Sequence, residues 1–129
     1  QLTKLSTDMA VPDTELDNTV LFYNRRLKDE GLQAVKFGHI GDNHVHVNIL
    51  PRSMDEYARA KALYLEWARE IIARGGTISA EHGVGKMKVA MLQEMLGESG
   101  VRKMQRVKAL FDPAGLLCPG NIMPAGEGQ

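Results

Sequence analysis

The sequence predicts an α+β fold, namely an antiparallel sheet with helices on one face and additional helices at the C-terminus. Two observations lead to this class. Residues 44–49 alternate between polar and apolar side chains, as in a strand with one buried face. Longer segments on both sides carry apolar residues at helical spacing and are bounded by glycine or proline. With 129 residues, the chain fits one domain with a modest core.

The N-terminal segment Leu2–Val11 is predicted as a strand. Pro12 and Asp13 close it and are typical of a helix start. An amphipathic helix is then expected over residues 14–30, and Gly31 follows directly, as is common after a helix C-terminus. The apolar stripe of this helix consists of Leu16, Val20, Tyr23 and Leu27.

A β-hairpin is predicted next. Its first strand, Gln33–Phe37, ends at His39, and the tight connection contains Gly41 and Asn43, which both tolerate positive φ. The chain can therefore reverse and bring His39 close to His46 on the second strand. Alternation along the second strand gives a core face of Val45, Val47 and Ile49 and an outer face of His44, His46 and Asn48. We expect the outer face to line a cleft.

A long helix follows the hairpin. Ser53 and Glu56 are spaced as a capping box at its start, and Gly75 is expected at its C-terminal cap. Its apolar stripe consists of Tyr57, Ala60, Tyr64, Trp67 and Ile71. Strand, helix, hairpin and helix make up about half to two-thirds of a ferredoxin-like sheet with helices on one face.

The C-terminal part of the chain is predicted to be helical. One helix covers Met87–Leu96 and a second covers Ser99–Phe111, with Gly97 between them. Asp112 and Pro113 end the second helix, and the tail beyond Pro124 is expected to be disordered.

Three of the four histidines lie in the hairpin, and the fourth, His82, directly follows Glu81. Two imidazoles and a carboxylate suit a divalent transition metal. On spacing alone, histidines that only make structural hydrogen bonds are the more common case. The glycines around Glu81 and His82 favour a binding site, because they let the backbone approach a ligand closely. In an extended segment the two side chains would point in different directions, one toward a metal and one toward a substrate.

These segments resemble the signature motifs of the C-terminal domain of FAD-linked 2-hydroxy acid oxidases and dehydrogenases. That family includes the glycolate oxidase D-subunit, D-lactate dehydrogenases and D-2-hydroxyglutarate dehydrogenase, within the vanillyl-alcohol oxidase superfamily. Three stretches carry the resemblance, in the order of the family pattern: Gly38–His46, Gly76–Gly85 and Asp112–Asn121.

The resemblance implies roles for individual residues. His39, His46 and Glu81 would coordinate a divalent metal, zinc or manganese, while His82 would act as the catalytic base and Asn48 would contact substrate. The metal would lower the pKa of the substrate hydroxyl. His82 would accept that proton while a hydride passes from the α-carbon to the flavin of FAD. The motifs identify no flavin-contacting residue in this chain.

The chain departs from the family pattern at several positions. Asn43 replaces a glycine, which is acceptable because asparagine can adopt left-handed backbone angles. His44 replaces an asparagine, and three readings stay open: a polar contact toward flavin, an extra metal ligand, or a tolerated substitution. Some members use a first-strand lysine to bind a second substrate carboxylate. The matching position here is Ser6, which favours a monocarboxylate substrate. Lys4, two residues earlier on the same strand face, could take the place of that lysine if the strand allows.

The final motif also differs, because Cys118 and Asn121 replace asparagine and lysine. The chain begins with Gln1 rather than Met, and the resemblance covers only the C-terminal part of the family. We therefore expect residues 1–129 to be the substrate or cap domain of a longer enzyme whose FAD-binding domain comes first. Alone, this domain would be catalytically silent. Its flavin-facing surface would be exposed in isolation, which would allow it to form a homodimer.

Composition excludes several classes of protein. The chain has 16 basic and 16 acidic residues, so its charge gives no reason to expect nucleic-acid binding. The single cysteine excludes an internal disulfide framework and fits a reducing, cytoplasmic location. No apolar run approaches the roughly 20 residues that span a bilayer. Peripheral membrane association would have to come from other parts of a full-length protein.

Two hypotheses from other classes remain beside the dehydrogenase. The chain could be a stand-alone metal- or ligand-binding ferredoxin-like module, which would bind a ligand without turnover. It could also be a small metallohydrolase in which Glu81 or His82 activates a metal-bound water, which would turn over substrate without flavin.

Overall fold

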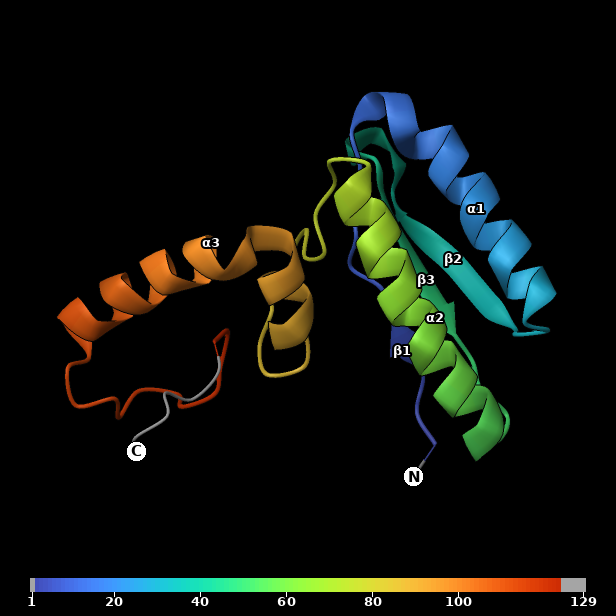
Figure 1. Cartoon of the computed structure of the whole chain (residues 1–129). Coiled ribbons are helices and arrows are strands. Elements are labelled where there is room, and N and C mark those ends of the chain that lie inside the picture. The colour runs from blue at the N-terminus through green and yellow to red at the C-terminus, as the bar shows by residue number, and fades with distance from the viewer. Residues whose placement is uncertain (1, 124–129) are drawn as a thin grey trace. The chain divides into compact units, whose positions relative to one another are not determined.

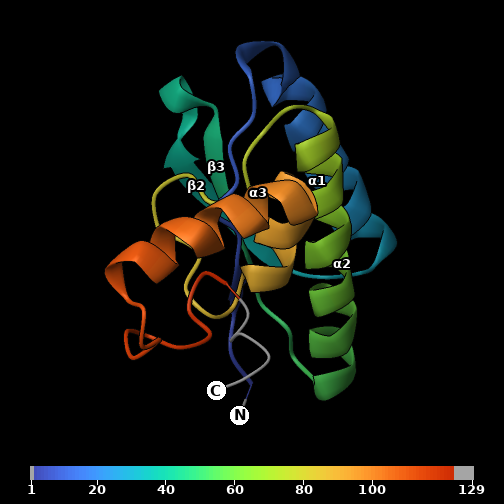
Figure 2. The ribbon, with the colours of Figure 1, turned by 60° about the vertical axis from the view of Figure 1, so that its left-hand side comes forward.

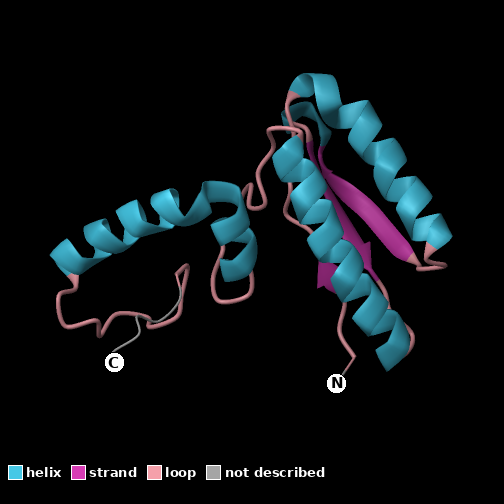
Figure 3. Cartoon of the chain, viewed as in Figure 1, coloured by secondary structure: helices cyan, strands magenta, loops and turns pink. Residues whose placement is uncertain are grey.

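The computed structural model describes residues 2–123 and divides the chain into two compact units. The first unit ends at His82 and the second begins at Gly83. The first unit contains the sheet and two helices, and the second contains one long, interrupted helix (Figures 1 and 3).

The sheet of the first unit has three antiparallel strands. They are β1 (Leu5–Ser6), β2 (Ala34–His39) and β3 (His44–Ile49), in the order β1-β3-β2. β3 is therefore the central strand, and its residues have neighbours on both sides. The two longer strands are joined by a 3-10 turn over Ile40–Asp42, followed by Asn43 at a left-handed φ of 53°. The expected hairpin and the expected role of Asn43 are both observed.

Two helices cover one face of this sheet. Figure 2 shows α1 (Leu16–Asp29) and α2 (Met54–Ala73) on the same side of β2 and β3. Trp67 of α2 is fully buried, and its ring centroid lies 4.4 Å from that of Tyr23 on α1. The apolar face of β3 is buried as well, with Val47 at 0% exposure. The prediction of an α+β fold with helices on one face is confirmed.

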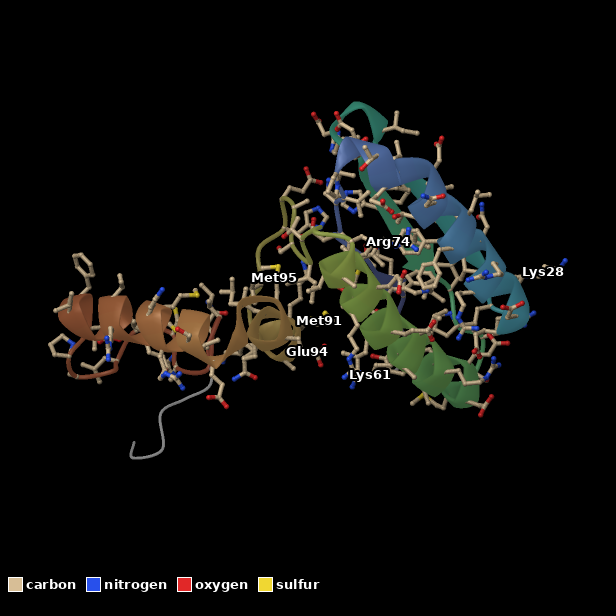
Figure 4. The ribbon with its side chains drawn as sticks, turned by 45° about the horizontal axis from the view of Figure 1, so that its top comes forward. Lys28, Lys61, Arg74, Met91, Glu94 and Met95 are labelled. Carbon is tan, nitrogen blue, oxygen red and sulfur yellow. The ribbon has the colours of Figure 1, made fainter. Side chains whose placement is uncertain are left out.

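Side chains fix both ends of α2. The Ser53 hydroxyl accepts a hydrogen bond from the Glu56 N–H, as in a capping box. The Glu56 carboxylate binds the backbone N–H and the guanidinium of Arg52 rather than the N–H of Ser53. At the other end, Arg74 (labelled in Figure 4) reaches Glu15, just before α1. Gly75 follows with a φ of 77°, as expected after a helix C-terminus.

The N-terminal strand is much shorter than predicted. Only two residues of the expected Leu2–Val11 strand pair regularly with β3. Ala10 makes isolated bridges to His44 and Thr77 further along. Between these places the Thr7 N–H still donates to the Val47 carbonyl, but the Thr7 carbonyl contacts the His46 side chain and the Asp8 carbonyl accepts from the Ala80 N–H.

The second unit is built on α3 (Val89–Phe111). Gly97, with φ of 64° and ψ of 173°, interrupts this helix where the sequence predicted a break. The Asp112 carboxylate accepts hydrogen bonds from the N–H groups of Leu116 and Leu117, which stabilises the turn after the helix. The expected disorder beyond Pro124 lies outside the described residues. Among the helices that the structure describes, none is both long and apolar enough to cross a membrane.

Candidate metal and catalytic site

The site lies entirely in the first unit, on the face of the sheet opposite the helices. Register pairs His39 with His44, Phe37 with His46 and Val35 with Asn48. Side chains of directly paired residues share a face of an antiparallel sheet. The hairpin therefore places these side chains in two adjacent rows, as the alternation of the sequence predicted.

The second glycine-bounded segment brings Glu81 and His82 to these rows. The Nε2 atom of His46 lies 2.9 Å from Oε1 of Glu81, and Nε2 of His39 lies 3.3 Å from Oε2. The Nε2 atom of His82 lies 3.3 Å from Oε1 of the same carboxylate. The other three predicted metal and catalytic residues, His39, His46 and His82, therefore converge on the Glu81 carboxylate.

Glu81 and His82 do not point in different directions. Both lie in a bent segment rather than an extended one, and their side chains turn toward the same point. The bend follows from Asp8, whose carboxylate accepts hydrogen bonds from both backbone N–H groups, at 3.1 Å from Glu81 N and 3.0 Å from His82 N. The expectation based on an extended chain was wrong for this reason.

His46 is the most enclosed of the four histidines, with 3% of its surface exposed. The His82 ring stacks on it at a centroid distance of 4.9 Å, and the Phe37 and His44 rings lie at 5.3 Å and 4.2 Å. His39 and His82 are accessible, each with 57% of the side chain exposed. The outer face of β3 was expected to line a cleft, but His46 and Asn48 are covered by neighbouring side chains and loops.

The cluster favours an ionised Glu81. The hydrogen bond from His46 is the largest cause that lowers the pKa of Glu81 below its ordinary value, and the nearby imidazoles of His39, His44 and His82 act in the same direction. Burial lowers the pKa of His44, and the neighbouring His46 adds to this effect. A carboxylate held in its charged form beside imidazole nitrogens is a suitable donor set for a divalent cation.

Four side chains in the cluster each offer a metal-ligating atom, and these atoms lie within 4.8 Å of one another: Asp8, His46, Glu81 and His82. This set overlaps the predicted ligands at His46 and Glu81. His39 is not in the set, although it contacts Glu81. The residues present therefore fit a metal through the chemistry and the closeness of their donors.

Asp8 is a candidate site residue that the sequence analysis missed. It is 1% exposed, and its Oδ1 lies 3.3 Å from Nε2 of His44. Alternation along the first strand could have found it, because a residue two positions after Ser6 shares the face on which Ser6 opposes Asn48. An acidic residue inside an otherwise buried segment is itself a sign of a specific role.

Asn48, the predicted substrate contact, is buried on the same face. Its Oδ1 has no hydrogen-bond partner among the residues described. Its two cross-strand neighbours are Ser6 on β1 and Val35 on β2, both neutral. A buried acceptor without a partner is costly, so a hydroxyl or N–H donor from a ligand would stabilise this position.

Comparison with known proteins gives consistent matches. A protein-family model described as FAD linked oxidases, C-terminal domain, matches residues 1–122. The glycolate oxidase subunit GlcD of Bacillus subtilis is 35% identical over 122 residues, which cover 93% of this chain and 26% of the relative. A D-2-hydroxyglutarate dehydrogenase of Stutzerimonas stutzeri is 42% identical over 97 residues, which cover 72% of this chain and 21% of the relative.

A probable mitochondrial D-lactate dehydrogenase of Danio rerio is 32% identical over 120 residues, which cover 92% of this chain and 24% of the relative. The chain therefore spans about a quarter of the length of these relatives. The resemblance carried by the three sequence motifs is confirmed.

Proposed function

Because this chain belongs to the family of C-terminal domains of FAD-linked oxidases, we propose that it is the substrate domain of a flavin-dependent D-2-hydroxy acid dehydrogenase. In this role it binds a divalent metal and the hydroxy acid, and it supplies the base for oxidation to the 2-oxo acid. The FAD would be bound mainly by a separate domain. The names of the relatives support the substrate class, since they include a glycolate oxidase subunit and D-lactate and D-2-hydroxyglutarate dehydrogenases.

One observation carries the proposal: three imidazoles approach one carboxylate. His39, His46 and His82 each have a ring nitrogen within 3.3 Å of a Glu81 oxygen. Placing imidazole and carboxylate groups this close together is energetically unfavourable unless they share a cation or a proton. The donors come from a hairpin and from a loop distant in the sequence. The cluster therefore results from the tertiary fold and not from proximity along the chain.

His39, His46 and Glu81 would hold the metal, and zinc or manganese suits this nitrogen and oxygen donor set. When bound, the metal would supply Lewis-acid polarisation of the substrate hydroxyl. His46 is enclosed, which suits a ligand. His82, like the proposed ligand His39, is more than half exposed and can meet a substrate.

His82 would accept the hydroxyl proton, and its contact with the His46 ring orients its imidazole for that transfer. When bound, FAD would supply the acceptor for the hydride that the substrate α-carbon gives up. Asn48 would accept a hydrogen bond from the substrate through its unpaired Oδ1.

The substrate is proposed to be a monocarboxylate of the lactate or glycolate type. Ser6 and Val35, which flank Asn48 across the sheet, carry no charge that could pair with a second carboxylate. Lys4 precedes β1 and is exposed, so it has no fixed place in the site. A neutral, partly apolar surrounding favours a small aliphatic substituent on the 2-hydroxy acid.

The test is reduction of FAD by a panel of D-2-hydroxy acids in the flavoprotein that carries this domain. The parent protein, His82→Ala and His39→Ala are compared under anaerobic conditions, with metal content measured in each. Reduction by D-lactate or glycolate that is lost in both variants is expected, with metal retained in His82→Ala. Equal reduction in all three would refute the site. Turnover without flavin would favour the hydrolase, and binding without any flavin reduction would favour the ligand-binding module.

A further inference from the structure

The backbone of Thr7 departs from the regular ladder at the edge of the site. Its N–H donates to the Val47 carbonyl at 3.1 Å, as an antiparallel pair requires. In a regular ladder the Val47 N–H would donate back to the Thr7 carbonyl. It donates instead to the Thr7 hydroxyl oxygen, at 2.9 Å. The Thr7 carbonyl is therefore available for another partner.

That partner is His46, whose Nδ1 lies 2.8 Å from the Thr7 carbonyl oxygen. A carbonyl can only accept, so Nδ1 is protonated, and Nε2 is the nitrogen directed at Glu81. A histidine that ligates a metal through one nitrogen commonly donates its other N–H to such a carbonyl, which fixes the ring and its tautomer. The hydroxyl of Thr7 thus makes it possible for the main chain to orient His46.

Asp8 performs the corresponding task for the other segment. Its carboxylate accepts hydrogen bonds from Ser79 Oγ at 2.9 Å and from the N–H groups of Glu81 and His82. Its backbone carbonyl accepts from the Ala80 N–H at 2.9 Å. Four consecutive residues are therefore bound by one buried aspartate.

We propose that Thr7 and Asp8 are positioning residues for the metal and base cluster. Thr7 orients His46, and Asp8 sets the bend that turns Glu81 and His82 toward it. The proposal rests on the metal-binding function above, but neither residue acts as a ligand in it. Three hydrogen bonds already engage the two carboxylate oxygens of Asp8, which favours positioning over direct coordination.

The role of Thr7 is tested with two substitutions that differ only in the hydroxyl. Thr7→Val leaves the buried Val47 N–H without an acceptor, so the Thr7 carbonyl should return to the ladder and release His46. We expect the zinc dissociation constant of the 129-residue chain to rise by roughly 10–100-fold. Thr7→Ser keeps the hydroxyl and should bind zinc as the parent does. Equal affinities for all three chains would overturn the role of Thr7.

Nitrogen NMR of the metal-free chain tests independently whether Thr7 orients the His46 ring. The parent and Thr7→Ser should show His46 with a proton on Nδ1 and a hydrogen bond to a carbonyl, whereas Thr7→Val should lose that signature. This measurement separates the two proposals. If the parent binds no zinc, the metal function fails, while the His46 spectrum still decides whether Thr7 orients the ring.

The role of Asp8 is tested with Asp8→Asn and, as a matched control, Asp17→Asn on the exposed side of α1. Asp8→Asn should weaken zinc binding by roughly 10–100-fold and speed amide exchange at Glu81 and His82. At saturation, the cobalt absorption spectrum should match that of the parent, because the ligands are unchanged. A changed spectrum would show that Asp8 is a ligand, and unchanged affinity would show that it has no role; either overturns the proposal.

Circular dichroism of each variant establishes that it is folded. If Asp8→Asn does not fold, Ser79→Ala removes only one hydrogen bond of the Asp8 carboxylate. A smaller loss of zinc affinity in the same direction, with faster exchange at Glu81 and His82, is then expected. No change in either quantity would overturn the role of Asp8.

Discussion

The imidazole of His46 and the carboxylate of Glu81 meet at 2.9 Å although 35 positions separate them in the sequence. The contact joins the central strand of the sheet to a loop that follows α2. It also lowers the pKa of Glu81, so the carboxylate is charged at neutral pH. The hairpin and the segment around Glu81, each bounded by glycines, thus place one anionic carboxylate beside imidazole rings.

Glu81→Gln should weaken zinc binding more than either positioning variant does. A neutral amide replaces a charged ligand, so the loss should exceed the roughly 10–100-fold that the removal of an outer-shell partner costs. Isothermal titration with zinc measures this effect, and Glu98→Gln, an exposed position on α3, is the control. Parent-like affinity in Glu81→Gln would remove Glu81 from the ligand set.

Gly38→Ala should disturb the site through the backbone beside His39. Gly38 has a φ of 147°, and an added Cβ would lie 2.5 Å from the carbonyl oxygen of His44. The φ strain alone is worth about 1–3 kcal/mol, and the contact with the backbone adds to it. We expect lower stability to urea together with weaker zinc binding.

Gly41→Ala is the matched control for that variant. Gly41 lies in the turn of the same hairpin, its φ is not positive, and an added Cβ would meet nothing within 4 Å. Its urea midpoint and zinc affinity should stay close to those of the parent. Equal behaviour of the two alanine variants would contradict the steric argument.

The Arg52–Glu56 pair should make stability depend on acid. The hydrogen bond from Arg52 is the main cause that lowers the pKa of Glu56 from 4.5 to about 2. A lowered folded-state pKa adds stability that is fully present above the unfolded value, and it is lost as the pH falls through about 2. The stability difference between the parent and Glu56→Gln should therefore shrink between these two pH values.

Urea unfolding over that pH range measures the effect of the pair. Arg52→Gln should show the same convergence with the parent, because it removes the donor that lowers the Glu56 pKa. A difference between the parent and Glu56→Gln that does not vary with pH would show that the ion pair contributes nothing to stability.

The sequence predicted the elements whose pattern is local. The alternation of β3 correctly divided Val47 from His46 and Asn48, because the two faces of a strand are set by the backbone alone. The break at Gly97 was also predicted from a local feature, because glycine tolerates the positive φ at which the helix is interrupted.

The parts that could not be predicted depend on contacts between distant segments. Nothing local shows that the Thr7 carbonyl leaves the ladder for a histidine side chain. The bend at Glu81 and His82 likewise depends on Asp8, more than 70 positions earlier. The motif could name these two residues, but only the tertiary structure could show that their side chains converge.

His44→Asn should leave zinc affinity near that of the parent. This result would exclude His44 as an extra metal ligand, one of the three interpretations of this residue. His44 is 4% exposed, and its Nε2 makes no hydrogen bond among the described residues despite lying 3.3 Å from Asp8. It also lies outside the group of converging donor atoms that contains His46 and Glu81. Burial lowers its pKa, so it adds no positive charge that would repel a cation at neutral pH.

Competition against a chromophoric zinc chelator compares His44→Asn with His46→Asn. The His46→Asn variant should lose most of its zinc affinity because it removes a proposed ligand. If both variants lose affinity equally, His44 is itself a ligand, and the metal would be held by an imidazole that the family pattern does not contain.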